Sequence, residues 1–305
     1  MYDTLRFRLN CLEREKRDLF SKFDFQEGRY PGHWSCQLDN LIIKVHGSII
    51  TVEGSLVKFH EGNTLCSLNR ETTKQAIDLL GDRLHLDIKS AHVTRIDIAA
   101  NFEMSHNVRE YLPFLGYYPR HKRDSKYRTS LYYGTNGHTC LFYDKGKELQ
   151  GKKGMESCLL RFESRWFKSL SAQLKWKNIT GGTLSDLDFY RYIIQLWSKN
   201  YFDIKKRNIP LPKPNVPINT AKKAKDYLFS ALLSSSMEST EELRMFLIEQ
   251  LDPQNKSRFN RMLNDLNDDF TINEMSPLME ELDSKIRDRI SLELSLSLIH
   301  ISEPT

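Results

Sequence analysis

The sequence predicts an α+β protein in which an N-terminal antiparallel sheet carries helices on one face and a small helical C-terminal domain follows. Strand-like segments with alternating polar and apolar residues fill much of the first two-thirds of the chain. Apolar residues at helical spacing occur between some of these segments. Beyond about residue 204, a proline-rich basic stretch gives way to helix-like segments, which indicates a second domain.

The composition is that of a globular chain with a basic balance. Of its 305 residues, 39% are hydrophobic and 11% are aromatic, which supplies enough large side chains for a buried core. The formal charge of +5 is compatible with nucleic-acid binding but does not establish it, because many basic proteins bind none. The position of the charge therefore matters more than its total.

The cysteines and the termini favour a reducing compartment without a membrane. No pair has the CxxC spacing of a zinc or redox site, and an odd, dispersed set argues against a disulfide framework. No run of about 18 apolar residues exists, and the N-terminus lacks the apolar core of a signal peptide. A cytoplasmic location without membrane partners is expected. The five cysteines are Cys11, Cys36, Cys66, Cys140 and Cys158.

The first elements are a strand at 4–9 and a hairpin or meander at 40–58, which Gly47 and Gly54 interrupt. A helix begins at Asn69, because apolar residues follow it at spacings of three and four. These apolar positions are Ala76, Ile77, Leu79, Leu80 and Leu84.

Two later strands carry the clearest pattern. In 92–103, isoleucine, alanine and phenylalanine alternate with charged and amide residues, and 157–166 repeats the alternation. Since an antiparallel sheet can leave one face in water, the polar sides are expected to form a wet, charged platform. A short helix near 108–114 and strands at 129–133 and 139–144 complete the first domain.

The predicted domain limits are 1–204 for the sheet domain, 205–218 for the basic linker and 219–293 for the helical domain. The C-terminal helices are expected at 219–235, 238–250, 254–267 and 275–292. The tail, 294–305, resembles the translation of a transposase adapter used in sequencing libraries. We expect it to be non-native, the alternative being an ordinary frayed terminus.

Tyr143, Asp97 and Glu163 form the most informative constellation, because their separate strands can converge. A tyrosine nucleophile, a divalent metal and lysines to neutralise phosphate would make a DNA-nicking site. Tyrosine is a weak nucleophile because its pKa is about 10, so a neighbouring metal or lysine is needed to favour the phenolate. Lys58 and Lys145 are the lysines expected to position or neutralise the scissile phosphate.

Asp97 and Glu163 are the expected metal ligands, since Mg²⁺ and Mn²⁺ prefer carboxylate oxygens and keep several waters. A third ligand stays open among Glu103, Glu53 and Asp144. The chain has no His-x-His pair. It therefore departs from nickases that hold the metal through two histidines on one strand.

Four short segments resemble, in the same order, motifs of the gene II/X family, the replication initiators of filamentous phages and related plasmids. They are 54–59 with the following Gly62-Asn63, 94–97, 142–145 and 160–165. The resemblance covers roughly residues 1–200. It implies rolling-circle initiation, in which a tyrosine nicks one origin strand and stays joined to the 5′-phosphate, freeing a 3′-hydroxyl primer.

By this resemblance, Tyr143 corresponds to the family's nicking tyrosine, and Lys145 corresponds to the lysine that follows it. The resemblance implies a site-specific single-strand DNA endonuclease and strand transferase in the cytoplasm of a bacterial host. Its expected partners are a single-stranded or supercoiled double-stranded origin, a host helicase and a host DNA polymerase. The products would be a covalent phosphotyrosine and a primer terminus.

DNA binding is expected at the basic segment 118–128, which is expected to form a loop between strands and has a tyrosine at or next to each end. Lysine and arginine neutralise phosphates, and aromatic rings stack on unpaired bases. Arginines beside the two carboxylates are expected either to orient them or to contact the DNA backbone. The predicted DNA-binding residues are Arg95, Arg120, Lys122, Arg123, Lys126, Arg128, Arg161 and Arg165.

Each assignment has a structural alternative. Tyr143 fits an ordinary strand tyrosine, with Tyr132 and Tyr133 as other candidate nucleophiles. Asp97 and Glu163 fit a plain lattice of cross-strand ion pairs with arginines, and the basic residues fit a solvated surface. The alternative functions are a non-catalytic origin-binding regulator and a metal-dependent nuclease that uses water. A covalent protein–DNA adduct separates the three. The tryptophans Trp166, Trp176 and Trp197 are expected in the core.

Overall fold

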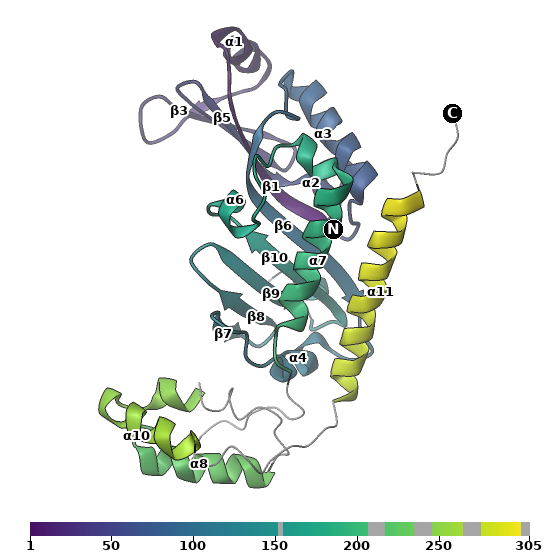
Figure 1. The fold of residues 1–305 in the computed structure, drawn as a ribbon. Helices are drawn as coiled ribbons and strands as arrows, with labels where there is room; N and C mark the ends of the chain where they lie inside the picture. The colour runs from purple at the N-terminus through teal and green to yellow at the C-terminus, as the bar shows by residue number, and fades with distance from the viewer. Residues whose placement is uncertain (152–154, 207–216, 235–245, 265–275, 300–305) are drawn as a thin grey trace.

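The structure, a computed structural model, describes residues 1–151, 155–206, 217–234, 246–264 and 276–299. It contains a ten-stranded, wholly antiparallel sheet with the strand order β2-β3-β4-β5-β1-β6-β10-β9-β8-β7 (Figure 1). Helices lie against the sheet and a smaller helical unit follows, so the predicted α+β class is confirmed. The strands are β1 (Tyr2–Asn10), β2 (Gln26–Glu27), β3 (His33–Leu38), β4 (Leu41–His46), β5 (Ile49–Ser55), β6 (His92–Glu103), β7 (Lys122–Tyr127), β8 (Ser130–Gly134), β9 (His138–Asp144) and β10 (Leu159–Trp166).

Some helices pack on the sheet, short ones lie in its connections, and others form the smaller helical unit. Asn69 caps α3 through its side chain, as predicted, and Asp186 caps α7 in the same way. The helices are α1 (Glu13–Lys22), α2 (Leu56–Glu61), α3 (Arg70–Leu84), α4 (Val108–Tyr111), η1 (Leu112–Phe114), α5 (Lys145–Gln150), α6 (Leu170–Gln173), η2 (Gly182–Ser185), α7 (Leu187–Phe202), α8 (Ala221–Ser234), α10 (Pro253–Asn264) and α11 (Pro277–Ile299).

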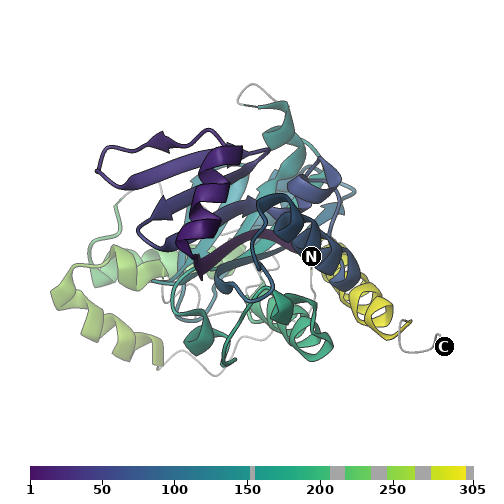
Figure 2. The ribbon, with the colours of Figure 1, turned by 90° about the horizontal axis from the view of Figure 1, so that it is seen from above.

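The main core lies between the sheet and α7. Ile96, Ile98 and Phe102 point from β6 toward the helix and are almost fully buried. Phe162 of β10 meets Trp197 of α7 with 4.9 Å between ring centroids. Each such side chain contributes roughly 1.5–3 kcal/mol through burial. The predicted alternation is therefore confirmed, because the apolar side chains of both strands lie in one core with those of α7. Figure 2 shows α7 and α11 on the same side of the sheet.

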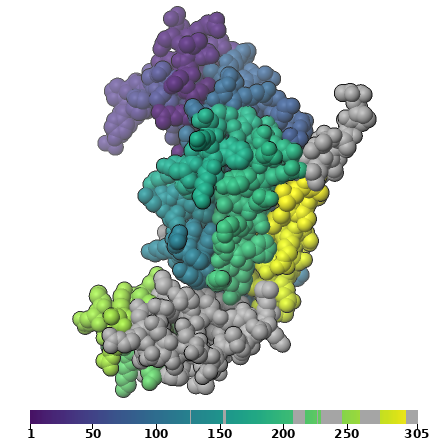
Figure 3. Space-filling model, in the orientation of Figure 1, coloured from purple at the N-terminus to yellow at the C-terminus, as the bar shows by residue number. Residues whose placement is uncertain are grey.

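Helix α11 joins this first core. It packs along α7, and the two helices lie side by side on the same face (Figure 3). Its carboxylates accept hydrogen bonds from buried tyrosines of the sheet domain: Tyr201 donates to Asp283 at 2.6 Å, and Tyr190 donates to Glu293. The predicted domain 219–293 is thus divided, because α11 shares its core with the first 204 residues.

A second, smaller core forms between α8, the segment 246–251 and α10. It shares no member with the main core among the residues the structure describes. Most of the predicted linker, the predicted helix at 238–250 up to residue 245, and the tail from residue 300 lie outside the described residues. The buried members of this core are Ile218, Ala224, Leu228, Leu247, Leu251 and Phe259.

Several elements differ from the predictions. The basic segment 118–128 was expected to be a loop, but β7 forms within it and closes one edge of the sheet. The helix α7 was not predicted, and neither was the N-terminal hairpin extension β2–β3. Two tryptophans, Trp166 and Trp197, are in the core as predicted, and Trp176 lies partly buried at its margin. Of the described helices, none has the length and apolar character needed to cross a membrane.

Candidate functional site

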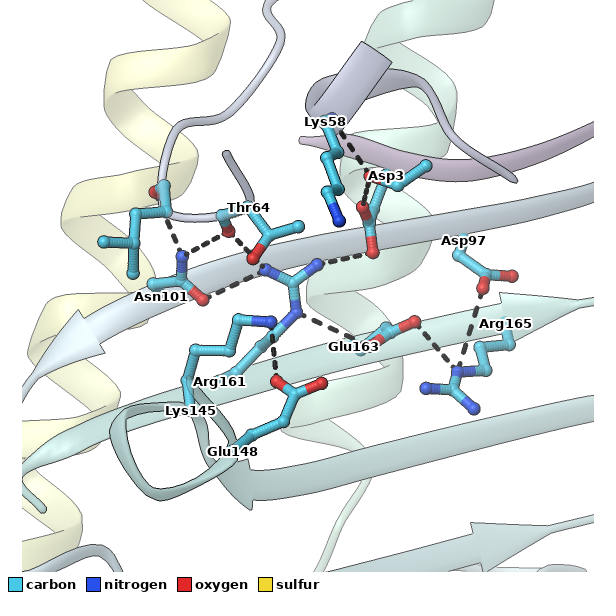
Figure 4. Close-up of polar contacts among 12 residues, drawn as sticks. Asp3, Lys58, Thr64, Asp97, Asn101, Lys145, Glu148, Arg161, Glu163 and Arg165 are labelled. Atoms are coloured by element: carbon cyan, nitrogen blue, oxygen red, sulfur yellow. Dashed lines mark hydrogen bonds and ion pairs between the residues drawn. The ribbon is translucent and has the colours of Figure 1, made fainter. Parts of the chain in front are cut away.

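The polar sides of β6, β10 and β9 share the face turned away from α7 and α11. Cross-strand pairing aligns Tyr143 with Arg161 and Arg161 with Asn101, so these three side chains form one row. Arg165 and Asp97 form a parallel row four residues farther along the strands. Figure 4 looks onto this face, with the ribbons of α7 and α11 behind the strands. The predicted convergence of the tyrosine strand with both carboxylate strands is confirmed.

Tyr143 lies half-buried in β9 and lines a pocket of about 480 Å³. The pocket is bounded by β8, β9 and α5, together with Tyr127 at the end of β7 and Arg165 from β10. It combines aromatic and cationic side chains, which are the two kinds that hold single-stranded DNA. Its other lining residues are Thr129, Ser130, Tyr132, Leu141, Asp144, Lys147, Glu148 and Gly151.

The turn after Tyr143 places a lysine beside it. Asp144 accepts a hydrogen bond from the backbone N–H of Lys147 at 2.8 Å, which caps α5 directly at the end of β9. Ser157 also donates to Asp144, through both its backbone N–H and its hydroxyl. Lys145 is consequently buried, with its Nζ 5.9 Å from the centroid of the Tyr143 ring. It is also 2.6 Å from Glu148, three residues later on α5.

The surroundings of Tyr143 keep its phenol protonated. Burial raises the pKa of Tyr143 well above its ordinary value, because the phenolate loses its hydration. The Arg161 guanidinium acts in the opposite direction, while Glu163 and Glu148 raise the pKa further. Arg161 is therefore the protein charge that most favours the phenolate.

Asp97 and Glu163 are buried and held by arginines (Figure 4). Arg95 donates to both oxygens of Asp97, at 3.0 Å from Nε and 2.6 Å from Nη2. Arg165 donates to Glu163 at 2.8 Å, and Arg161 lies 3.5 Å from the other Glu163 oxygen. The face was predicted to be wet, but this part of it is not, because Asp97 and Glu163 are 0% and 2% exposed.

The same lattice extends across the neighbouring strands. Glu53 of β5 accepts hydrogen bonds from Arg6 at 2.8 Å and from Arg95 at 2.9 Å. Asp3 of β1 binds Arg161 at 2.6 Å. The four carboxylates Asp3, Glu53, Asp97 and Glu163 are thus matched by the four arginines Arg6, Arg95, Arg161 and Arg165.

The two central carboxylates titrate differently. Burial raises the pKa of Asp97 to about 7, and the charge of Glu163 acts in the same direction. Burial also acts to raise the pKa of Glu163, but Arg165 and Arg161 outweigh it and hold that pKa below its ordinary value. Glu163 is therefore the more acidic member of the pair.

These residues, as they are placed, do not fit a divalent metal. The oxygens of Asp97 and Glu163 already face guanidinium groups, and two further positive charges would enter a lattice that is balanced. Within the described ranges no group of three or more His, Cys, Asp or Glu side chains has a metal-binding arrangement. Of the open third ligands, Glu53 is held by arginines and Asp144 caps α5, while Glu103 is exposed at the end of β6.

The predicted DNA-binding residues of 118–128 separate into two groups. Arg120, Lys122 and Arg128 are exposed, as phosphate contacts require. Arg123 instead donates to the backbone carbonyls of Leu115 at 3.1 Å and Leu112 at 3.4 Å. It pairs with Tyr133 across β7 and β8, so it faces the helices and was wrongly predicted to bind DNA. The side chain of Lys126 lies outside the described part of the structure.

The candidate tyrosines differ in burial and in whether they line the Tyr143 pocket. Tyr118 is buried against His121 and donates to Asn200 at 3.1 Å, so it cannot stack on a base. Tyr127 is 56% exposed and lines the Tyr143 pocket. Of the other candidate nucleophiles, Tyr133 is buried on the helix side, whereas Tyr132 lines the same pocket as Tyr143.

Lys58 extends from α2 toward the lattice and is exposed (Figure 4). Three residues of the site were not predicted: Asp3 and Asn101, which bind Arg161, and Glu148, which binds Lys145. Asn101 had a signal in the alternation of its strand, and Glu148 had one in its position three residues after Lys145 on a helix. Asp3 had none.

Residues 1–180 match the family described as the N-terminal region of a replication-associated protein, the gene II protein. The chain belongs to this family. The matched region includes Tyr143, Asp97 and Glu163, and the resemblance inferred from the sequence motifs is confirmed. No curated protein matches the chain.

Among solved structures, the rolling circle replication initiator protein from Geobacillus stearothermophilus is similar at 15% identity and a TM-score of 0.42, over 70% of this chain and 89% of that one. That likeness is too weak to support any functional assignment. The assignment of this gene II family chain to replication therefore depends on the family match.

Proposed function

We propose that this gene II family protein initiates rolling-circle replication of a phage or plasmid by nicking one origin strand through tyrosine transesterification. The observation that carries the proposal is the position of Tyr143. It lies in a pocket on the polar face, aligned with Arg161 and beside Lys145, within the region that matches the replication family. Host helicase and DNA polymerase would then use the primer terminus.

The proposed step is a balanced exchange of ester bonds. The Tyr143 hydroxyl oxygen forms a bond to the scissile phosphorus, and the bond from phosphorus to the 3′-oxygen breaks. The phenol loses its proton and the leaving 3′-oxygen gains one, so a 5′-phosphotyrosine and a 3′-hydroxyl result. Because one ester replaces another, the reverse reaction can rejoin the strand without an external energy source.

The pocket supplies the charge and shape that this step requires. Arg165 and Lys147 line it, and Lys145 lies close to the tyrosine ring, so cations surround the position of a bound phosphate. Tyr127 and Tyr132 provide rings on which unpaired bases can stack. A volume of about 480 Å³ falls within the range of small-ligand sites, so it accommodates a nucleotide.

The preference of Mg²⁺ and Mn²⁺ for carboxylate oxygens made Asp97 and Glu163 the expected metal ligands. Since arginines hold both carboxylates, we assign no step to an ion and propose a positioning role for the pair. Glu163 orients Arg165, whose side chain reaches the pocket, and Asp97 fixes Arg95 within the lattice. The exposed Arg120, Lys122 and Arg128 are proposed contacts to the flanking backbone.

The test is a search for a covalent adduct. Wild type, Tyr143→Phe and the matched control Tyr132→Phe are each incubated with single-stranded oligonucleotides from the element's intergenic region, with Mg²⁺, with Mn²⁺ or with chelator. A denaturing protein gel then reports a band shifted by attached DNA. We expect the band in wild type and Tyr132→Phe and its loss in Tyr143→Phe. Loss of the wild-type band in chelator would show that an ion takes part.

Other outcomes would contradict the proposal in distinguishable ways. A band that persists in Tyr143→Phe would assign the nucleophile to another residue. Tight binding of a verified origin without any nick would indicate a non-catalytic origin-binding regulator. Free nicks without an attached protein would indicate a nuclease that uses water, for which Tyr143 would not matter.

A further inference from the structure

A second polar row crosses the same sheet far from Tyr143. Backbone pairing places Arg8 of β1 opposite His92 of β6 on one side and Thr51 of β5 on the other. Thr51 in turn pairs with Lys44 of β4, and Lys44 with Ser35 of β3. Because directly paired residues share a face, these five side chains form one line across five neighbouring strands. Arg6 and Arg95 form the next row, which connects this line to the arginine–carboxylate lattice.

The row carries two exposed cations, Arg8 and Lys44. Arg8, Lys44 and His92 are exposed, and within the described chain neither Arg8 nor Lys44 has an ion-pair partner. Arg6, two residues earlier on the same strand, shows the contrast, because it is bound to Glu53 at 2.8 Å. Exposed cations without a partner in the protein are available to an external anion.

The spacing of the row relative to Tyr143 matches one turn of duplex DNA. Tyr143 shares its row with Asn101, and His92 lies nine residues back along β6, which is about 30 Å at 3.3 Å per residue. Across the sheet, Arg8 is three strands from Tyr143 and Lys44 is five, or about 14 and 24 Å at 4.8 Å per strand. On a flat lattice these spacings give separations of roughly 33–38 Å, close to the 34–36 Å rise of one helical turn.

We infer that this row, named here the β-row (His92, Arg8, Thr51, Lys44 and Ser35), binds the phosphate backbone of double-stranded DNA about one helical turn from the nick. The inference rests on the proposed nicking function of Tyr143. The β-row contains no tyrosine, tryptophan or phenylalanine, whereas Tyr127 and Tyr132 line the Tyr143 pocket. Stacking rings suit unpaired bases, and isolated cations suit a duplex whose bases already stack on one another.

The test uses the full chain, with Arg8→Ala/Lys44→Ala as the variant. Lys74→Ala/Lys177→Ala is the matched control, because it removes the same charge from exposed lysines of α3 and of the segment after α6. Arg8→Lys/Lys44→Arg keeps both charges. Thermal unfolding of each variant checks that the fold is intact. Three substrates are compared: a short single strand that spans the nick site, the same strand with a duplex of about 15 base pairs on one side, and the same strand with that duplex on the other side.

Affinity for the duplex-flanked substrate is measured as a function of salt concentration. Loss of two phosphate contacts is expected to lower the slope of log K against log salt by about 1.8 in Arg8→Ala/Lys44→Ala, since each contact contributes about 0.9. The charge-removing control and the conservative variant should keep the wild-type slope. Adduct formation on the short single strand, which does not reach the β-row, measures the Tyr143 reaction separately.

A wild-type salt slope in Arg8→Ala/Lys44→Ala on both duplex-flanked substrates would overturn the inference. An equal fall in slope on the short single strand would also overturn it, because the row would then contact the single strand. If wild type forms no adduct, the proposed nicking function fails instead. The difference in slope between the two alanine variants still decides whether the β-row binds duplex DNA.

Discussion

Arg161 connects the stability of the sheet to the chemistry of Tyr143. Replacing it should lower the free energy of unfolding more than replacing any neighbouring arginine. Arg161 is 3% exposed, and its guanidinium contacts Asp3 at 2.6 Å, Asn101 at 3.1 Å and Glu163 at 3.5 Å. Arg161→Met keeps much of the length of the side chain but leaves buried carboxylates without this counter-charge. Breaking a buried pair by removing one partner costs about 3–5 kcal/mol, so we expect that loss in the free energy of unfolding.

Urea unfolding at pH 7 followed by circular dichroism measures the loss, with Arg165→Met as the control. Arg165 is about one-third exposed, so solvent screening should limit its cost to about 1–2 kcal/mol. Asp3→Asn completes a double-mutant cycle, and the coupling with Arg161 should exceed about 1 kcal/mol. A cost below about 1 kcal/mol with no coupling to Asp3 would refute the buried-lattice account.

Arg161→Met should also slow adduct formation, because Arg161 is the charge that most lowers the pKa of Tyr143. Because Arg161→Met should also be less stable than wild type, the rates are compared at a lowered temperature at which both proteins are folded. An unchanged rate would separate Arg161 from the reaction and leave it with a purely structural role.

Three further predictions concern single positions. Burial lowers the pKa of His138 to about 3, whereas its pKa in the unfolded chain is near 6.5, so the free energy of unfolding should fall by about 2 kcal/mol from pH 7 to pH 5 as the unfolded chain takes up a proton. His138→Gln should show a flatter dependence of that free energy on pH. Asn69→Ala removes the cap of α3 and should cost about 1 kcal/mol in urea unfolding, whereas Asn69→Asp should cost little. Gly146→Ala would place a Cβ 2.2 Å from the Ser157 hydroxyl, so adduct formation should fall. Adding Ser157→Gly should restore adduct formation, and failure to restore it would contradict the steric explanation.

The alternation of side chains along two strands was predictable from sequence because the period of a strand is two. It placed Asp97, Arg161 and Glu163 on one face before any fold was known, and the pairing of β6 with β10 confirms it. The start of α3 was predictable for a similarly local reason, since Asn69 provides a cap.

The features that were missed depend on contacts between distant segments. Asp3 reaches Arg161 across 158 positions of sequence, and no local pattern marks that pair. Arg123 could not be assigned to a face, because β7 is an edge strand whose register is set by β8 alone. Helix α11 joins the first core through Met279, Leu282 and Ile286. Buried tyrosines also bind its carboxylates Asp283 and Glu293, whereas apolar periodicity indicates only that a helix is present.

The most direct test of the central claim is to locate the attached nucleotide by mass spectrometry. After nuclease trimming of the adduct, trypsin would release a single peptide from Thr129 to Lys145 that contains Tyr132, Tyr133 and Tyr143. Fragmentation of this peptide distinguishes the three, while Tyr127 falls in a different peptide. We predict a nucleotide 5′-phosphate on Tyr143. Its presence on Tyr132 or Tyr127, or a trimmed adduct whose Tyr143 is unmodified, would contradict the account.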